Sequence, residues 1–174
     1  MSLYLIIDGY NLIRQSPSLS RQEARALEFG REALLARLAS YKRIKPHPIT
    51  VVFDAAEGPV PGETTQRSRG IKVVYSSASE TADQVIYRLA RNLGTQALVV
   101  TSDVALTRAV ESAGAIAVSS QEFEDRMEQA FYLDVKGEET EDEDYEPSLS
   151  TRKKGPSRRL PKAIRRRKAR LKKI

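Results

Sequence analysis

Short runs of apolar residues, each followed by a polar residue, constrain the fold of this chain more than any other feature. The runs span residues 3–7, 49–53, 70–75, 97–100 and 115–118. Runs of this length are typical of strands that are buried on both faces, as in parallel sheets. Helical patterns separate most of them, and alternating strands and helices imply right-handed crossovers. The sequence therefore predicts an α/β fold with a mainly parallel five-stranded central sheet and helices on both faces.

Four segments with helical spacing of apolar residues lie between and after these runs. They end near residues 42, 92, 113 and 133, and the serines placed to cap their starts are Ser20, Ser79, Ser102 and Ser119. Arg31 falls within the apolar stripe of the first helix, where its stem is expected to lie along the core with its head in water; the alternative is a head that faces the site. Residues 55–70 are rich in glycine and proline, which predicts a loop without regular structure.

The distribution of charge divides the chain into three parts. Residues 1–137 carry 16 basic and 16 acidic side chains, residues 138–150 add seven acids and no base, and residues 151–174 add 13 bases and no acid. Acidic runs of this kind are usually disordered. We therefore expect a folded domain over residues 1–135, an acidic disordered linker over residues 136–150 and a basic tail over residues 151–174.

The chain contains no cysteine and no run of eighteen apolar residues. The first fact excludes disulfides and thiolate chemistry, and the second argues against a membrane-spanning helix. The apolar run at the N-terminus is too short for a signal peptide. We therefore expect a cytoplasmic protein with no membrane partner.

Acidic residues follow three of the predicted strands. Asp8, Asp54 and Asp103 come after the first, second and fourth runs, and Asp83 lies in the first turns of the helix before the fourth run. Because the carboxyl ends of parallel strands share one edge of the sheet, these side chains should converge there. Converging carboxylates repel one another, and Mg²⁺ or Mn²⁺ would offset that cost. The set predicts a metal site, although each acid alone is better explained by a turn or a helix N-terminus.

Other chemistries centred on acids do not fit the spacing. A phosphatase with an aspartyl nucleophile would carry a second acid at the position of Tyr10, and a receiver domain would carry a lysine where Ser119 and Ser120 stand. Gly9 permits a tight turn but stands alone, so no glycine-rich phosphate loop is present. Metal-dependent hydrolysis of a phosphodiester remains.

Four short motifs carry the acids: Asp8-Gly-Tyr-Asn11-Leu, Val51-Val-Phe-Asp54, Glu80-Thr-Ala-Asp83 and Ser102-Asp103. Together they resemble the NYN domain of the PIN-like nuclease group, in its bacterial YacP-like branch. The resemblance covers about residues 1–133 and does not extend into the basic tail. It implies a PIN-like three-layer fold and Mg²⁺- or Mn²⁺-dependent endonucleolytic cleavage of RNA. One branch of this family cleaves messenger RNA within the ribosome, which makes the ribosome a candidate partner by resemblance.

The resemblance also implies roles for the matching residues. Asp8, Asp83 and Asp103 would be the catalytic acids that bind the metal. Asp54 would be a weaker metal ligand, and Asn11 would orient Asp8 or the phosphate.

Basic and aromatic side chains outside this set are predicted to contact RNA. Tyr10 and Arg14 lie near the expected cleft, and Arg67 and Arg69 lie in the loop that could close over it. Surface salt bridges are an equally good explanation for these arginines.

A tail dense in arginine would bind phosphate backbones without reading sequence, and Pro161 could start a helix within it. The predicted contacts in the tail are Arg158, Arg159, Arg165, Arg166, Arg167, Lys168 and Arg170. The alternative is a solvated tail that the acidic run neutralises.

The sequence therefore predicts a metal-dependent endoribonuclease. The alternative is a non-catalytic RNA- or ribosome-binding protein on a PIN-like scaffold, and the intact set of acids favours the enzyme. A toxin-type PIN nuclease with a partner antitoxin is less favoured, because the chain carries its own long tail.

Overall fold

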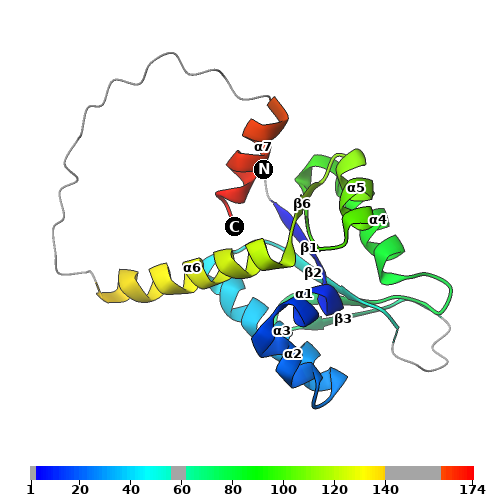
Figure 1. Ribbon diagram of the computed structural model, residues 1–174, viewed down its shortest axis with the longest axis horizontal. Coiled ribbons are helices and arrows are strands. Elements are labelled where there is room, and N and C mark those ends of the chain that lie inside the picture. Colours follow the sequence, from blue (N-terminus) through cyan, green and yellow to red (C-terminus); the bar gives the residue numbers. More distant parts are fainter. Residues whose placement is uncertain (1–2, 56–61, 140–161) are drawn as a thin grey trace.

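A six-stranded sheet forms the centre of the computed structural model, which describes residues 3–55, 62–139 and 162–174 (Figure 1). The strand order is β3-β4-β2-β1-β5-β6. The strands are β1 (Tyr4–Asp8), β2 (Ile49–Phe53), β3 (Thr64–Ser68), β4 (Ile71–Tyr75), β5 (Ala97–Val100) and β6 (Ile116–Val118). All neighbouring strands pair in parallel except β3 and β4. The mainly parallel α/β sheet predicted from the apolar runs is confirmed, with one strand more than expected.

The additional strand, β3, lies within residues 55–70, for which the sequence predicts no regular structure. Its five residues are polar and mostly exposed, so they lack the apolar pattern by which the other strands were predicted. A two-residue turn joins β3 to β4, and both of its residues have positive φ: 51° at Arg69 and 77° at Gly70. Positive φ at both turn positions gives the type I′ geometry that suits an antiparallel hairpin. The prediction of an unstructured loop was therefore wrong for residues 64–68.

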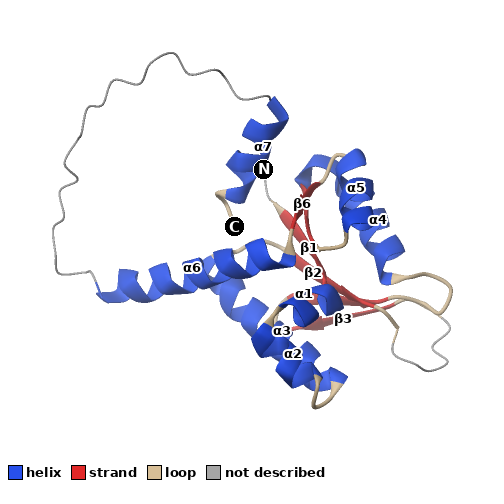
Figure 2. Ribbon diagram, in the orientation of Figure 1, coloured by secondary structure: helices blue, strands red, loops and turns tan. Residues whose placement is uncertain are grey.

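Helices cover both faces of the sheet (Figure 2). They are α1 (Gly9–Gln15), α2 (Pro17–Glu23), α3 (Leu27–Ile44), α4 (Ala82–Leu93), α5 (Val104–Ser112), α6 (Ser120–Glu139) and α7 (Lys162–Leu171), with a short 3₁₀ turn η1 (Gly94–Gln96). One core packs α1, α3 and α6 against Leu5, Ile7 and Phe53, and the other packs α4 and α5 against Ile6 and Val52. The alternation of side chains along each strand thus feeds two cores. No helix in the described part of the chain is both long and apolar enough to span a bilayer.

Three of the predicted helix starts are wrong. Ser20 lies inside α2, which begins at Pro17, a residue that suits the first turn because it needs no backbone N–H there. The cap of α4 is Thr81, which forms a capping box with Gln84, and the cap of α5 is Asp103. For α4 and α5, a nearby residue caps the helix in place of the predicted serine. The single helix predicted from Ser20 to about residue 42 is instead two helices, α2 and α3, and α3 begins at Leu27 without a side-chain cap.

The last predicted helix starts where expected but is longer. The Ser119 hydroxyl accepts a hydrogen bond from the backbone N–H of Glu122 at 3.1 Å, as a helix cap should. The helix α6 then continues to residue 139, beyond the predicted end near residue 133. The first four residues of the predicted linker, 136–139, are therefore helical, and the rest of it, 140–150, lies outside the described residues.

Gly9 starts α1 directly above the ring of Phe53. A Cβ atom at this position would lie 2.5 Å from Cδ1 and 2.9 Å from Cζ of that ring, closer than real Cβ contacts. Phe53 is fully buried, with Tyr10 at its edge and Tyr75 stacked on it, so its ring has little freedom to move. The expected reason for glycine here was a tight turn. The structure shows a close approach between α1 and β2 instead.

We predict that Gly9→Ala lowers the free energy of unfolding by about 1–3 kcal/mol, the usual cost of overpacking a core. Helix propensity alone would act in the opposite direction, by about 1 kcal/mol. Urea unfolding followed by circular dichroism measures the difference. Gly62→Ala is the matched control, because nothing lies within 4 Å of its added Cβ. Equal stability of Gly9→Ala and the parent would contradict the packing argument.

Candidate functional site

Asp8 lies at the carboxyl end of β1, where that strand passes directly into α1. Its carboxylate accepts a hydrogen bond from the backbone N–H of Asn11 at 3.3 Å and another from the Thr101 hydroxyl at 3.1 Å. Thr101 follows β5, the strand that pairs with β1. The side chain is only 9% exposed. Asp8 is therefore a buried carboxylate, oriented by one helix N-terminus and by one neighbouring strand end.

Asn11 joins the ends of three strands. Its side-chain carbonyl accepts hydrogen bonds from the backbone N–H of Ser102 at 2.9 Å and from the hydroxyl of Ser120 at 2.7 Å. The Ser102 hydroxyl in turn accepts from the backbone N–H of Ser120 at 3.1 Å. Asn11 follows β1, Ser102 follows β5 and Ser120 follows β6. The structure thus places Asn11 as a link between the loops that form this edge of the sheet.

Asp54 and Asp103 each hold the N-terminus of a helix. One oxygen of Asp54 accepts from the backbone N–H of Ala82 at 2.8 Å, at the start of α4. One oxygen of Asp103 accepts from the backbone N–H of Leu106 at 2.7 Å, at the start of α5. These bonds are the capping roles that the sequence offers as the alternative for each acid taken alone. They leave the second carboxylate oxygen of each residue for other contacts.

The pKa values show that the acids share one electrostatic environment. Burial raises the pKa of Asp8 to about 6; the hydrogen bonds from Asn11 and Thr101 act against this shift, and the charges of Asp83 and Asp54 add to it. Partial loss of hydration also raises the pKa of Asp83, and the charges of Asp103 and Asp54 add to the effect. The structure therefore brings together the four acids that the sequence predicts to converge at this edge.

These residues do not form a closed metal cage. Within the described residues, no three acids or histidines lie close enough to hold one ion. Mg²⁺ is commonly held by one or two carboxylates together with waters and the phosphate of a substrate. Asp83 fits such a site because it caps no helix, and Asp8 fits it although it caps α1. The raised pKa of each reflects nearby negative charge as well as burial. The donor set is made of hard oxygens, as Mg²⁺ and Mn²⁺ require.

A cluster of basic and aromatic side chains lies next to the acids. The Arg31 guanidinium donates a hydrogen bond to the Tyr10 hydroxyl at 3.0 Å and lies 5.8 Å from the centre of the Tyr75 ring. Arg14 lies over the Tyr10 ring at 5.3 Å and pairs with Glu23 at 3.4 Å. The expectation that the head of Arg31 lies free in water was wrong. Its place inside the apolar stripe was the one signal in the sequence for this arrangement.

Arg67 and Arg69 lie away from the acids. The register of the hairpin places Thr64 opposite Tyr75, at the carboxyl end of β4, and Arg67 opposite Lys72, near its amino end. Arg69 lies in the turn beyond and pairs with Glu32 at 3.7 Å. These two arginines therefore lie toward the opposite end of β4 from the acidic edge.

The C-terminal helix α7 packs against the domain. Leu171 and Ile174 are buried, and the Arg126 guanidinium donates to the backbone carbonyl of Leu171 at 2.6 Å. A ring nitrogen of His47 lies 2.8 Å from the backbone carbonyl of Lys173. The helix predicted after Pro161 is present, and its C-terminal end forms part of the fold.

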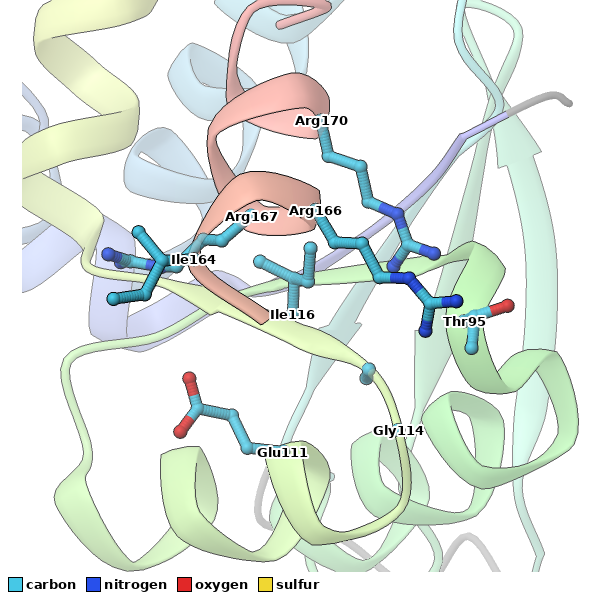
Figure 3. A pocket seen from close by; sticks show the side chains of 9 residues that line it. Thr95, Glu111, Gly114, Ile116, Ile164, Arg166, Arg167 and Arg170 are labelled. Atoms are coloured by element: carbon cyan, nitrogen blue, oxygen red, sulfur yellow. The ribbon is translucent and has the colours of Figure 1, made fainter. Parts of the chain in front are cut away.

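A cavity of about 390 Å³ separates α7 from the amino ends of β5 and β6 (Figure 3). Arg166 and Arg170 extend from α7 toward Thr95 on its far wall. The acids lie at the carboxyl ends of the strands, whereas the cavity is bounded by segments that lead into the amino ends of β5 and β6. The cavity therefore lies at the opposite end of these strands from the acids. Of the other predicted tail contacts, Arg165, Arg167 and Lys168 lie on α7, and Arg158 and Arg159 lie outside the described residues.

We predict that Asp8→Asn changes how stability depends on pH. Because the pKa of folded Asp8 lies near 6 and its ordinary value near 3.8, ionisation costs the folded state about 3 kcal/mol in total. This cost grows as the pH rises from about 4 to 6 and then stays constant. In EDTA, the unfolding free energy of the variant should therefore rise relative to that of the parent by about 1–2 kcal/mol between pH 5 and 7.5.

Urea unfolding at the two pH values measures this change. Asp134→Asn, which replaces an exposed acid far along α6, is the matched control and should show no such change. A difference between Asp8→Asn and the parent that does not vary with pH would contradict the raised pKa.

Comparison with known proteins places the chain in a family. The model of the YacP-like NYN domain matches residues 5–172. An uncharacterized protein YacP from Bacillus subtilis (strain 168) is 35% identical over 122 residues, which cover 68% of this chain and 71% of that protein. The crystal structure of Rae1 (YacP) from Bacillus subtilis has a TM-score of 0.66 at 30% identity, with 80% of each chain covered. The crystal structure of a mutant of that protein has a TM-score of 0.67 at 29% identity, with 82% of this chain and 86% of that chain covered.

These matches confirm the PIN-like α/β fold and correct the extent of the resemblance. The family match continues beyond residue 133 and includes α7, so the C-terminal helix lies within the matched length of the domain. The family is nuclease-like, in agreement with the cluster of acids at the strand ends. The chain belongs to the YacP-like NYN family.

Proposed function

We propose that this protein is a metal-dependent endoribonuclease that hydrolyses phosphodiester bonds in RNA. The observation that carries the proposal is the convergence of Asp8, Asp54, Asp83 and Asp103 at one edge of the sheet, where negative charges add to the raised pKa values of Asp8 and Asp83. Unpaired carboxylates held together in this way are costly unless a cation binds among them. The same edge is the place where α/β folds bind their ligands.

Each acid would have a distinct role. Asp8 and Asp83 would hold Mg²⁺ or Mn²⁺, and Asp54 and Asp103 would add negative charge while fixing the starts of α4 and α5. Asn11 would act as a positioning residue, because its side chain holds the three loops around Asp8. When bound, the ion would activate a water molecule and neutralise charge on the phosphate. The buried hydrogen bonds of Asp8 would keep that carboxylate oriented toward the ion.

RNA in the cytoplasm would be the substrate, with the ribosome as a candidate partner. The basic side chains of α7 support contact with a phosphate backbone, since Arg166 and Arg170 form no ion pair within the described residues. Arg166 and Arg170 lie near the amino ends of β5 and β6, at the opposite end of the strands from the acids. This position favours a role in holding a large RNA over a role in cleavage. Arg158 and Arg159 lie outside the described residues, and their contact with RNA stays a prediction from the sequence.

Two observations favour the alternative of a non-catalytic RNA-binding protein. Asp54 and Asp103 hold helix starts, and no three acids in the described residues are grouped to hold one ion. A scaffold that had lost catalysis could retain both features. Cleavage and metal binding therefore have to be measured separately.

We predict that Asp83→Asn abolishes RNA cleavage and leaves the fold unchanged. The side chain is exposed and caps no helix, so its loss should not lower the melting temperature. The rate of RNA cleavage should fall by more than the roughly 10- to 100-fold typical for residues that only support a metal ligand. The test uses purified protein, a labelled RNA and a titration of Mg²⁺ or Mn²⁺, with Asp134→Asn as the control.

Cleavage by Asp83→Asn at the parent rate would show that the metal site is assigned wrongly. Binding of RNA by the parent without cleavage at any concentration of either ion would support the non-catalytic alternative.

We predict that Arg166→Gln combined with Arg170→Gln weakens RNA binding and reduces its dependence on salt. For a single strand, the slope of log K against log salt should fall by about 0.7 for each lost phosphate contact. Fluorescence anisotropy with a labelled RNA between about 50 and 200 mM salt measures the slope. The matched control is Arg91→Gln with Arg108→Gln, which removes the same charge from exposed positions on α4 and α5. An unchanged slope in the α7 variant would exclude this contact.

A further inference from the structure

Arg31 is a partly buried cation with no acidic partner in contact with it among the described residues. Its guanidinium is held by the Tyr10 hydroxyl at 3.0 Å and by the face of the Tyr75 ring at 5.8 Å. The charge of Glu28, on the same helix, acts on it, but no carboxylate in the described part of the chain lies within 4 Å of it, whereas Arg14 pairs with Glu23 near the same edge. Buried charges in proteins are normally paired. A cation whose direct contacts are neutral groups is therefore suited to an anion from outside the chain.

The rings around Arg31 form a continuous aromatic cluster. Phe53 lies at its centre and is fully buried, with the Tyr10 ring at 5.0 Å in an edge contact and the Tyr75 ring stacked at 5.7 Å. Tyr10 and Tyr75 are partly exposed, and the Tyr75 hydroxyl accepts a hydrogen bond from the Gln66 amide at 3.4 Å. In the free protein Arg31 lies over the Tyr75 ring and Arg14 over the Tyr10 ring. A base can therefore stack on either ring once the arginine that lies over it turns to a phosphate.

The aromatic cluster lies beside the acids at the carboxyl ends of the strands, on the other face of the sheet from Asp54. Phe53 and Asp54 are consecutive, and side chains of consecutive strand residues point to opposite faces. Phe53 packs in the core under α1 and α3, while Asp54 reaches the start of α4. A strand of RNA that crosses this edge would meet the acids on one side and Arg31 on the other.

We propose that Arg31, Tyr10 and Tyr75 form a subsite for one unpaired nucleotide of single-stranded RNA. The Arg31 guanidinium pairs with the phosphate of that nucleotide, and the base stacks on the Tyr75 ring that the guanidinium covers in the free protein. A guanidinium suits phosphate through its planar set of donors, and stacking on aromatic rings binds bases of any sequence. Bases in a duplex are already stacked and cannot enter such a subsite. The inference rests on the proposed function in one respect, which is that the ligand is RNA.

The test measures binding in EDTA, where no cleavage can occur. The probe is a single-stranded RNA that carries 2-aminopurine, whose fluorescence is quenched when the base stacks. Arg31→Gln should weaken binding about tenfold and lower the salt slope by about 0.7. Tyr75→Leu should reduce the quenching, and Tyr75→Phe should retain it because the ring is kept. A duplex of the same sequence should show no quenching by the protein.

Two controls separate this subsite from a structural role. Arg43→Gln changes an exposed arginine at the far end of the same helix and should bind RNA like the parent. Arg31→Lys keeps the positive charge, so it should retain the salt slope of the parent while losing part of the affinity. Melting temperatures of all variants show which of them are folded at the temperature of the assay.

The subsite is overturned if folded Arg31→Gln binds with the affinity and salt slope of the parent, or if Tyr75→Leu quenches 2-aminopurine as the parent does. These outcomes are independent of catalysis. If the parent cleaves RNA with Mg²⁺ but Arg31→Gln binds normally, the subsite alone is wrong. If the parent never cleaves RNA but the binding effects are present, the subsite stands on a non-catalytic RNA-binding protein.

Discussion

The side chain of Asn11 accepts two hydrogen bonds with one carbonyl oxygen, and the geometry of the acidic edge depends on them. They join the segments after β1, β5 and β6, while the nearby contact between Asp8 and Thr101 makes a second link between β1 and β5. Strand ends would otherwise diverge into independent loops. Because these bonds are short and partly buried, they fix the starting points of α1, α5 and α6 relative to one another.

The fold places negative charge where it opposes stability. Asp8 is buried, and the charges of Asp83 and Asp54 add to the cost of its ionisation. Most of the remaining core is apolar, so this edge is a described region where local electrostatics and packing disagree. Such conflicts are typical of functional sites, where a bound ligand restores the balance. The neighbouring cation Arg31 has the complementary property, because it too lacks a contacting partner of opposite charge within the described residues.

The sequence allowed the layers of the fold and the approach of the acids to be predicted, because both follow from local rules. Buried strands read as apolar runs, and the carboxyl ends of parallel strands must share an edge. It did not allow β3 to be predicted, since that strand is polar and is defined by its partner and by the turn at Arg69. The caps at Thr81 and Asp103 depend on where each helix starts in three dimensions. The apolar stripe of α3 indicates that Arg31 faces the domain, but its partners Tyr10 and Tyr75 lie far from it in the chain and could not be predicted from that local pattern.

The docking of α7 has a consequence for the outer edge of the sheet. The strand β6 ends the strand order, and its three residues, Ile116, Ala117 and Val118, are all buried and apolar. An open edge of this composition could pair with the same edge of another molecule, which is a common route to aggregation. Arg167 of α7 donates a hydrogen bond to the backbone carbonyl of Ala117 at 3.4 Å and also pairs with Glu122. The basic helix therefore serves as a cover for this edge, and β3 protects the opposite edge through its short length and polar side chains.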